Sequence, residues 1–367
     1  MAKKLEEIDP AMGFVTVNRD GMDWHTVDSR GFELNGFYWR KPGEILRRLP
    51  ESVKITEELD ILAWNTAGGM LRFRSDTSDI RIAAQLDHAF KNSDIGTAVG
   101  GCGFDLYLGQ GTAKTFHRVT RFDASADEYT VPIFGPAPVK KIREFTIHFP
   151  LYSGLKKLEF GLTPGAKILP PTPWPDPRPI VLYGTSIEQG GCASRPGMCP
   201  TNQMSRLLNR PFLNFGFSGN GRGQKEAAEI LAEIADPAMY VLDYDDNALP
   251  ELLEKTIRPF IRILRQSHPE TPILMLSTEP KSAEAFEPFD SAYASKERPL
   301  YNQIHQTVFD ELRAAGDDNI YYLDGRMLYG ADFDECTVDG AHATDLGSYR
   351  IAHALAPVIE RILHRWW

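Results

Sequence analysis

Apolar and polar residues alternate along the first 162 positions of the chain with the period of two that is typical of β-strands. The pattern predicts strands at 61–64, 70–73, 80–86, 104–108, 112–122, 128–133, 143–149 and 155–162, with shorter alternations at 14–17 and 32–34. Turn residues separate these segments, and Asn35-Gly36 is a hairpin signal. No segment of this region has a convincing helical stripe. Many short, evenly spaced strands favour a β-sandwich or jelly roll.

A proline-rich stretch follows at 164–179. Seven of its 16 residues are proline, which excludes a helix or a central strand because proline lacks the amide hydrogen. We interpret this stretch as a stiff, extended linker, with Trp174 docked on a domain surface. It separates a predicted accessory β-sandwich at 1–163 from a second domain at 180–367.

After the linker, short apolar runs alternate with amphipathic segments. The pattern predicts strands at 180–183, 212–215, 239–243, 272–277 and 320–323, and helices near 200–209, 222–235, 251–267, 295–315 and 344–364. Repeated β-α units of this size predict a parallel sheet between two layers of helices. The predicted fold class is therefore α/β, with a β-sandwich in front of it.

The composition is that of a soluble globular protein, with 42% hydrophobic and 25% charged residues. The net charge of −10 argues against a nucleic-acid partner, because phosphate binding needs a basic surface. No apolar run reaches the ~18 residues that a membrane span needs, so we expect no membrane partner either. No apolar segment follows Lys3 and Lys4, as a secretory signal would require. We expect a cytoplasmic protein, or a secreted one if the chain is a processed form.

The four cysteines and nine histidines show no spacing that is typical of metal ligands. Cys192 and Cys199 could pair across a loop, although reduced thiols fit a cytoplasmic protein better. The sequence also has neither a phosphate-binding loop nor a dinucleotide-binding glycine motif. We therefore predict no metal and no cofactor.

Candidate catalytic residues follow the predicted strands of the second domain. Ser186 comes after the first strand, Gly219 lies in a glycine-rich turn after the second, and Asn247 follows the third. Asp339 and His342 come shortly before the last helix. The carboxyl ends of parallel strands lie at one edge of a sheet, where open α/β folds form a crevice. We therefore expect these residues to lie close together.

Acyl transfer through a serine needs these residue types. His342 can take the proton of Ser186, because an imidazole titrates near neutral pH. Asp339 can hold the other ring nitrogen of His342. The backbone N–H groups of Ser186 and Gly219 and the side-chain amide of Asn247 could stabilise the oxyanion of the tetrahedral intermediate.

Each candidate also has a structural alternative. Asp339-Gly-Ala-His342 could be a turn before a helix, Asn247 could form an Asx turn, and residues 218–221 could be a simple loop. Ser186 could lie in an ordinary turn after a strand. Four independent loops would then have to imitate one mechanism in order, so we favour the catalytic interpretation.

Ser186, Gly219, Asn247 and His342, in this order, resemble the four signature blocks of the SGNH (GDSL-like) hydrolases. The match is strongest at 339–347 and at Ser218-Gly219. The resemblance implies a three-layer α/β/α, flavodoxin-like hydrolase domain. It also implies that Ser186 is the nucleophile, His342 the base with Asp339 as its partner, and Ser186, Gly219 and Asn247 the oxyanion hole.

Two signature blocks depart from the usual family pattern. The usual Gly-Asp-Ser is Gly-Thr-Ser at 184–186, and the usual Gly-x-Asn-Asp is Asp-Asp-Asn-Ala at 245–248. Both are similar to a sub-branch with an N-terminal β-sandwich, which has a segment like 189–197 and a Gly-x-Asp-Leu-Tyr motif like 103–107. This resemblance covers nearly the whole chain and implies an ester hydrolase that acts on an acylated sugar.

The loop at 188–200 is expected to wall a small acyl pocket suited to acetyl groups. Arg195 and Glu188 are the candidate substrate contacts, although a structural salt bridge is an equal alternative for Arg195. The expected partner is a small-molecule or oligosaccharide ester. A lysophospholipase- or thioesterase-type acyl hydrolase and a carbohydrate-binding protein without turnover are the alternatives. The sequence leaves open the sugar, the acyl chain length, the role of the N-terminal domain and the oligomeric state.

Overall fold

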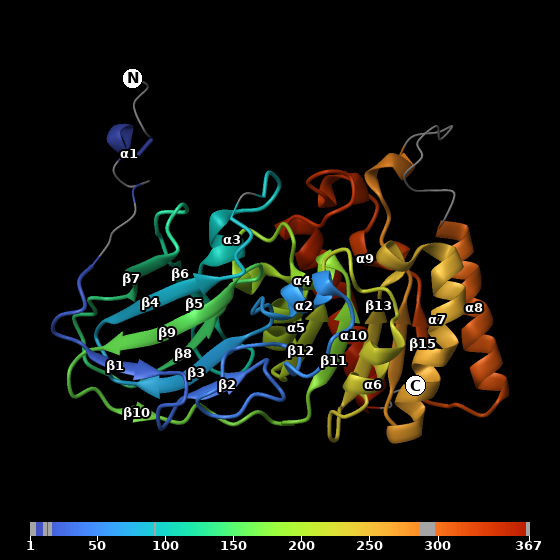
Figure 1. Cartoon of the computed structure of the whole chain (residues 1–367), viewed down its shortest axis with the longest axis horizontal. Helices are drawn as coiled ribbons and strands as arrows, with labels where there is room; N and C mark the ends of the chain where they lie inside the picture. The colour runs from blue at the N-terminus through green and yellow to red at the C-terminus, as the bar shows by residue number, and fades with distance from the viewer. Residues whose placement is uncertain (1–4, 10–12, 14–16, 92, 286–297, 365–367) are drawn as a thin grey trace.

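The computed structural model of the protein describes residues 5–9, 13, 17–91, 93–285 and 298–364. It contains an antiparallel β region, formed by the N-terminal part of the chain, and an α/β region beside it (Figure 1). Short apolar strands with period-two alternation build the first region, and longer amphipathic helices build the second. The predicted sequence of a β domain and an α/β domain is therefore confirmed.

Two antiparallel sheets make up the N-terminal region. One sheet has the order β1 (Asp23–Thr26), β9 (Gly154–Leu162), β4 (Ile80–Asp87) and β7 (Glu128–Phe134). The other has the order β10 (Ile168–Leu169), β3 (Met70–Ser75), β8 (Arg143–His148), β5 (Asp105–Leu108) and β6 (Thr115–Val119), and β2 (Glu33–Asn35) also pairs with β3. Phe73 and Phe145 of one sheet and Ile82 and Phe160 of the other share a single buried core. The region is thus a β-sandwich, whereas the jelly-roll detail stays a prediction.

Two sequence-based predictions for this region are wrong. The segment predicted as a strand at 61–64 belongs to α2 (Glu57–Ala63), whose first turn is capped by Thr56, which accepts a hydrogen bond from the backbone N–H of Leu59 at 3.1 Å. Asn35-Gly36 does not form a tight hairpin, because β2 pairs with β3 through the register Asn35–Met70. The region also contains α1 (Leu5–Ile8) and α3 (Ala98–Cys102). Of the alternation at 14–17, residues 14–16 lie outside the described residues.

The α/β region has a five-stranded parallel sheet in the order β12, β11, β13, β14, β15. This 2-1-3-4-5 order is that of flavodoxin-like folds. The strands are β11 (Ile180–Gly184), β12 (Phe212–Gly216), β13 (Met239–Asp243), β14 (Ile273–Leu276) and β15 (Ile320–Leu323). The helices are α4 (Ser186–Gln189), α5 (Pro200–Leu208), α6 (Lys225–Leu231), α7 (Asp245–Ser267), α8 (Arg298–Ala314), α9 (Arg326–Tyr329) and α10 (Asp345–His364).

The helices cover both faces of this parallel sheet. Tyr183 on one face of β11 shares a buried cluster with residues of α6, α7 and α8. Leu182 on the opposite face shares another cluster with residues of α5 and α10. The three-layer α/β/α arrangement is therefore confirmed. The helix predicted at 251–267 corresponds to the part of α7 that follows a kink at Leu249, whose φ is +56°. That kink precedes Pro250, which disfavours a helical residue before it.

The proline-rich stretch lies extended along the β-sandwich. Its residues Ile168 and Leu169 form β10, and the Arg72 guanidinium lies 3.7 Å from the ring centroid of Trp174. The Trp174 indole also donates to Asn35 Oδ1 at 3.3 Å. Trp174 is thus docked on the β-sandwich.

One segment of the N-terminal region packs into the core of the α/β region. Leu49 before α2, and Leu59 and Leu62 of α2, share a buried cluster with Phe215 of β12 and Phe217 after it. The two regions therefore have a continuous apolar contact.

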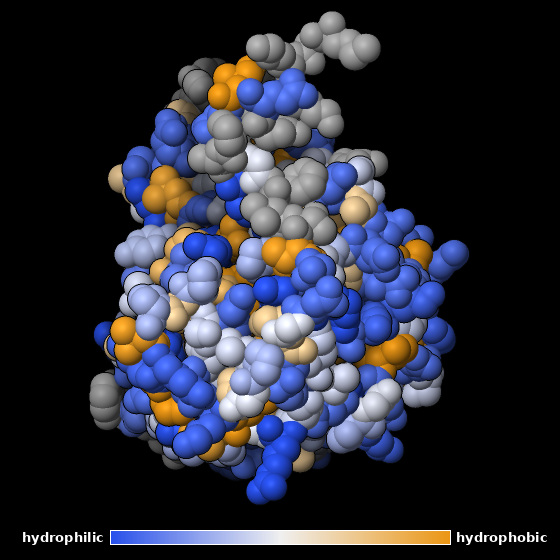
Figure 2. All heavy atoms as spheres, turned by 90° about the vertical axis from the view of Figure 1, so that its left-hand side faces the viewer, coloured by the Kyte–Doolittle hydropathy of each residue, from blue (hydrophilic) through white to orange (hydrophobic). Residues whose placement is uncertain are grey.

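Figure 2 shows the β-sandwich end of the molecule as mostly hydrophilic, with apolar residues scattered singly over it. Scattered apolar residues are normal on protein surfaces and do not indicate a docking site. Among the helices of the described residues, none combines the length and the apolar character that crossing a membrane requires.

Candidate active site

Ser186 lies where β11 ends and α4 begins. The buried strand ends at Gly184, Thr185 caps the helix, and Ser186 is its first residue and only 7% exposed. The Thr185 backbone N–H donates to Glu188 Oε2 at 2.7 Å, and the Thr185 hydroxyl donates to the same oxygen at 3.0 Å. The Thr185 side chain in turn accepts from the backbone N–H of Glu188, and reciprocal bonds of this kind fix the first turn of a helix. The turn that carries Ser186 is therefore rigidly held.

Two glycines let α4 lie directly against the ends of the strands. A Cβ on Gly216 would lie 2.3 Å from the backbone nitrogen of Gln189, and a Cβ on Gly184 would lie 2.4 Å from Glu188 Oε2. Any larger residue would push α4 away from the sheet. Close backbone contact therefore requires glycine at both positions.

The turn after β12 presents the second predicted block. Gly219 has φ of +69°, a conformation that glycine adopts without strain. The backbone N–H of the preceding Ser218 donates to Gln189 Oε1 at 3.0 Å, which ties this turn to α4. The backbone N–H groups of Gly219 and Ser186 donate to no residue in the described part of the chain. Both amides are available as oxyanion donors.

His342 and Asp339 form a hydrogen-bonded pair on the loop before α10. His342 Nδ1 lies 2.7 Å from Asp339 Oδ2. Asp339 Oδ1 accepts the backbone N–H groups of Ala341 at 3.0 Å and His342 at 2.8 Å. Partial burial alone would raise the pKa of Asp339, but the hydrogen bonds from His342 and Ala341 outweigh it and lower that pKa. An ionised Asp339 keeps the proton of the neutral imidazole on Nδ1 and leaves Nε2 as the acceptor.

Asn247 lies in the first turn of α7, shortly after the end of β13. Its backbone N–H donates to the Tyr244 carbonyl at 3.2 Å. Its side-chain Oδ1 is buried and has no hydrogen-bond partner among the residues with described positions, so it does not accept in an Asx turn. Asn247 is also absent from the described lining of the cleft that contains Ser186. Its role as an oxyanion donor stays a prediction.

Ser186 and His342 line the same cleft, which has a volume of about 940 Å³. Residues after the first two strands of the parallel sheet contribute to its wall. Besides Ser186 and His342, the α/β region contributes Gly191, Cys192, Ser218 and Asn220. The structure therefore brings Ser186 and His342 to one crevice, and their catalytic roles stay a prediction.

The rest of the cleft lining comes from the N-terminal region. Ile61 of α2, Phe90, Lys91, Ile95 and Tyr152 belong to it. The side chains of Phe90 and Ile61 are 46% and 36% exposed, which is high for large apolar residues. Sequence reasoning missed them, because no local pattern shows which β-sandwich loop faces the second domain. The β-sandwich therefore forms part of the site.

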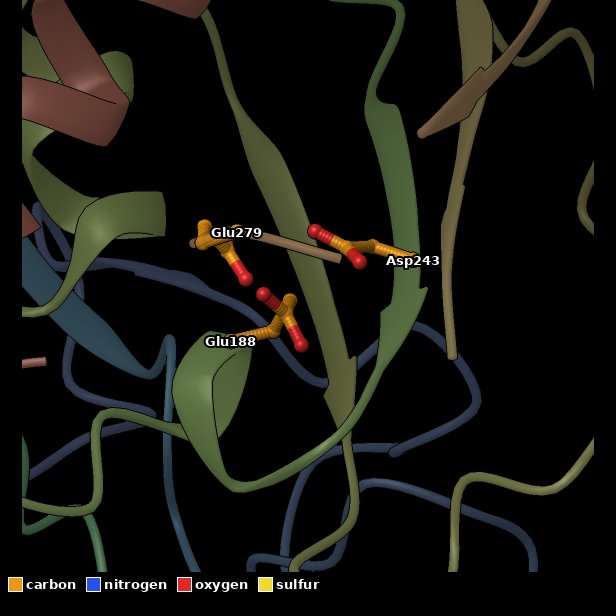
Figure 3. A group of neighbouring side chains, drawn as sticks. All are labelled: Glu188, Asp243 and Glu279. Carbon is orange, nitrogen blue, oxygen red and sulfur yellow. The ribbon is translucent and has the colours of Figure 1, made fainter. Parts of the chain in front are cut away.

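Glu188 of α4 lies in a group of three buried carboxylates with Asp243 and Glu279, and their ligand oxygens are within 4.8 Å of one another. Figure 3 shows the carboxylates of Glu188 and Glu279 facing each other, with Asp243 beside them. Burial, followed by mutual repulsion, raises the pKa of Asp243 and raises that of Glu279 to about 8. Burial also raises the pKa of Glu188. The three carboxylates are close enough together to coordinate a cation. Their raised pKa values mean that protons can neutralise them instead.

The two predicted substrate contacts lie away from the cleft wall. Glu188 is 2% exposed, and its carboxylate accepts from Thr185 as described above. Arg195 Nη1 lies 2.7 Å from both Asp105 Oδ2 and the Tyr107 hydroxyl. The structure thus shows the salt-bridge alternative for Arg195. We therefore propose neither residue as a substrate contact.

Cys192 and Cys199 are buried free thiols. Burial raises the pKa of Cys192 to about 11 and that of Cys199 to about 12. High pKa values make thiols poor nucleophiles. Neither cysteine therefore competes with Ser186 as a candidate nucleophile.

Two family models match this chain in consecutive segments. The model of the GDSL-like lipase/acylhydrolase family matches residues 177–360. The chain belongs to this family. A second model, of the N-terminus of SGNH-hydrolase-type esterases, carries the name of the GxDLY motif and matches residues 22–168. The chain is therefore a GDSL-like carboxylic ester hydrolase, and its β-sandwich is the N-terminal region that accompanies such esterases.

Solved structures match this GDSL-like hydrolase over nearly its full length. A GDSL-like lipase from Bacteroides ovatus is 29% identical with a TM-score of 0.84, and the match covers 94% of this chain and 98% of that one. The salicylyl-acyltransferase SsfX3 from a tetracycline biosynthetic pathway is 17% identical with a TM-score of 0.71, covering 92% and 96%. The acetyl xylan esterase Est2A from the rumen bacterium Butyrivibrio proteoclasticus is 11% identical with a TM-score of 0.60, covering 94% and 100%. The last two similarities show the fold alone. Comparison with curated proteins gives no match.

Proposed function

We propose that this hydrolase removes short acyl groups, acetyl above all, from a carbohydrate by way of an acyl-enzyme on Ser186. The supporting observation is that Ser186 and His342 line one cleft while Asp339 holds the Nδ1 side of the imidazole. A nucleophile, a base and a group that orients the base are the parts that serine catalysis needs. A binding protein without turnover has no use for this set.

The reaction follows from these roles. Ser186 Oγ attacks the ester carbonyl carbon while His342 Nε2 takes the hydroxyl proton. The resulting oxyanion accepts hydrogen bonds from the backbone N–H groups of Ser186 and Gly219 and from the Asn247 amide. The carbon–oxygen bond to the alcohol then breaks, and the alcohol takes the proton from His342. Water attacks the acyl-enzyme by the same steps in reverse and releases the acid.

The lining of the cleft suggests which part of the substrate lies where. The backbone of Gly191 and the small side chain of Cys192 lie just after the nucleophile and suit a compact acyl group. Polar residues elsewhere in the cleft lining, such as Ser93 and Asn220, suit the hydroxyl-rich alcohol. The acetyl xylan esterase with the same fold adds an analogy to this assignment.

A second candidate function is hydrolysis of esters with a longer or aromatic acyl group. The exposed side chains of Phe90 and Ile61 on the cleft wall favour it, because apolar acyl chains gain binding energy from such surface. The cleft volume of about 940 Å³ exceeds what an acetyl group alone would fill. The acyl chain length of the ester that is hydrolysed fastest distinguishes the two candidate functions.

Hydrolysis of p-nitrophenyl acetate, butyrate and octanoate by the wild type and by Ser186→Ala tests both points. We expect the variant to lose on the order of 10⁶-fold in kcat, as the loss of a nucleophilic serine does elsewhere. The acetate ester should give the highest kcat/KM of the series. Faster turnover of octanoate would favour the second candidate, and activity that survives in Ser186→Ala would remove the catalytic assignment.

A further inference from the structure

The segment after the nucleophile contacts three separate parts of the molecule. We call residues 190–199 the bridging loop. It follows α4 directly, and its residues Gly191 and Cys192 line the cleft beside Ser186. Its remaining residues connect the cleft to the β-sandwich on one side and to α10 on the other.

A buried carboxylate of the β-sandwich holds the end of the bridging loop. Asp105 of β5 is fully buried, and its Oδ2 accepts the backbone N–H of Gly197 and Nη1 of Arg195, each at 2.7 Å. Its Oδ1 lies 2.7 Å from Nδ1 of the buried His148. Removing one partner of a buried ion pair leaves the other charge buried and unpaired, which destabilises the fold. This carboxylate is the aspartate of the Gly-x-Asp-Leu-Tyr motif, so the motif has a structural purpose in this chain.

The start of α3 holds the middle of the bridging loop. The Thr97 hydroxyl donates to the Ser194 carbonyl at 2.7 Å and accepts the backbone N–H of Gly100 at 2.8 Å. A Cβ on Gly100 would lie 2.2 Å from the Ala193 carbonyl oxygen, so α3 packs directly on the loop. The β-sandwich therefore fixes the position of Ser194.

Ser194 in turn holds the segment that carries the base. Its backbone N–H donates to Asp345 Oδ1 at 2.8 Å, and its hydroxyl donates to Asp345 Oδ2. Asp345 is the first residue of α10 and comes three residues after His342. Within the described residues, these two hydrogen bonds are the ones that join the bridging loop to the segment containing His342.

We propose that Ser194 and Asp345 are positioning residues that set the distance between His342 and Ser186, and that Asp105 and Thr97 hold Ser194 for this purpose. The proposal rests on the proposed function, since it takes Ser186 and His342 as the reacting pair. Local bonds, such as the pairing of 337 with 343, shape the His342 loop but do not tie it to the nucleophile. Proton transfer requires a heavy-atom distance of about 2.6–3.2 Å, so a small displacement of this loop would slow it.

Removing the Ser194 hydroxyl tests the first link. We expect Ser194→Ala to lower kcat for p-nitrophenyl acetate roughly 10- to 100-fold, the range that a displacement of about 1 Å or less produces. KM should change little, because the substrate surface of the cleft stays intact. Ser194→Thr keeps the hydroxyl and should recover most of the lost kcat. Ser205→Ala is the matched control, since its hydroxyl bonds the Arg210 carbonyl at 2.7 Å elsewhere in the α/β region.

Combining substitutions tests the path through the β-sandwich. Asp105→Asn should lower kcat in the same way, and the double variant Asp105→Asn/Ser194→Ala should lose less than the product of the two single losses, because both act through one connection. Thr97→Val should lower kcat, whereas Thr97→Ser should retain it. Asp176→Asn is the matched control for the loss of an aspartate, since Asp176 pairs with Arg210 away from the cleft. If Asp105→Asn fails to fold, the comparisons of Thr97→Val with Thr97→Ser and of Ser194→Ala with Ser194→Thr provide the test.

The outcomes separate this proposal from the proposed function. Unchanged kcat in Ser194→Ala and Thr97→Val, together with an inactive Ser186→Ala, would overturn the positioning role and leave the esterase intact. A lowered melting temperature with normal kcat would overturn it too, since the residues would then serve stability alone. Full activity in Ser186→Ala would overturn both, because Ser186 and His342 would not be the reacting pair.

Discussion

The two halves of the proposed catalytic pair are held by different means. Ser186 is 7% exposed and lies at the start of α4, which packs against the strand ends through Gly184 and Gly216. The His342 and Asp339 side chains are 33% and 32% exposed and lie on a loop. Close backbone packing, added to the Thr185–Glu188 capping bonds, therefore fixes the nucleophile, whereas hydrogen bonds on a loop fix the base. Among the residues that support the reacting pair, single polar substitutions should consequently have larger effects on the base side.

The largest such effect is expected at Asp339. Asp339→Asn should lower kcat by about 10⁴-fold, because an amide would favour the wrong tautomer of His342. Steady-state hydrolysis of p-nitrophenyl acetate measures it. Glu188→Gln is the matched substitution on the nucleophile side, where packing should preserve most of the activity. Equal losses of kcat in Asp339→Asn and Glu188→Gln would contradict the inference that the nucleophile is held more firmly than the base.

A smaller effect is expected at the oxyanion hole. Asn247→Ala should lower kcat roughly 10²- to 10³-fold with little change in KM, if the amide donates to the oxyanion. The same assay measures it, with Asn209→Ala at the C-terminal end of α5 as the control. A loss of less than about ten-fold would mean that Asn247 only shapes the start of α7.

The group of buried carboxylates formed by Glu188, Asp243 and Glu279 should make the stability of the fold depend on pH. The pKa of Glu279 rises from 4.5 to about 8 on folding, so the folded state binds a proton more tightly between these values. Stability from this group is thus fully present below pH 4.5 and is lost as the pH rises through 8. Glu279→Gln should reduce this decline, so that the melting temperature of the variant falls by several degrees less than that of the wild type as the pH rises. A change of about a few kcal/mol in the free energy of unfolding produces a shift of this order.

Calorimetry of the wild type, Glu279→Gln and the exposed control Glu251→Gln at pH 5 and pH 8.5 measures this effect. A decline of the same size in all three proteins would show that the carboxyl group of Glu279 is not its source. Wild-type stability that rises on adding millimolar calcium or magnesium at pH 8.5 would show that a cation, and not protons, satisfies the cluster.

The smallest effect is expected on the cleft wall of the β-sandwich. Phe90→Ala removes an apolar side chain that is 46% exposed, so it should raise KM a few-fold for octanoate and hardly at all for acetate. The ratio of the two KM values measures it. Equal changes for both esters would place the acyl group elsewhere in the cleft.

The sequence predicted the α/β region well because each of its strands is a short apolar run between amphipathic helices. Prediction fails at α2, where Ile61 and Trp64 fit the period of a strand although Thr56 and the acidic residues after it indicate a helix start. The serine and histidine blocks were predictable because strand ends share an edge. Phe90 and Tyr152 were not, since their place in the cleft depends on how two regions pack.

Arg48 gives the contact between the two regions a further consequence. This fully buried guanidinium donates to the carbonyls of Leu62, Asn214 and Gly216, and burial lowers its pKa to about 9. Separating the regions would leave the carbonyls of Asn214 and Gly216 without this donor and expose the apolar face of α2. The protein should therefore melt in a single cooperative transition, even though a proline-rich stretch joins its two regions.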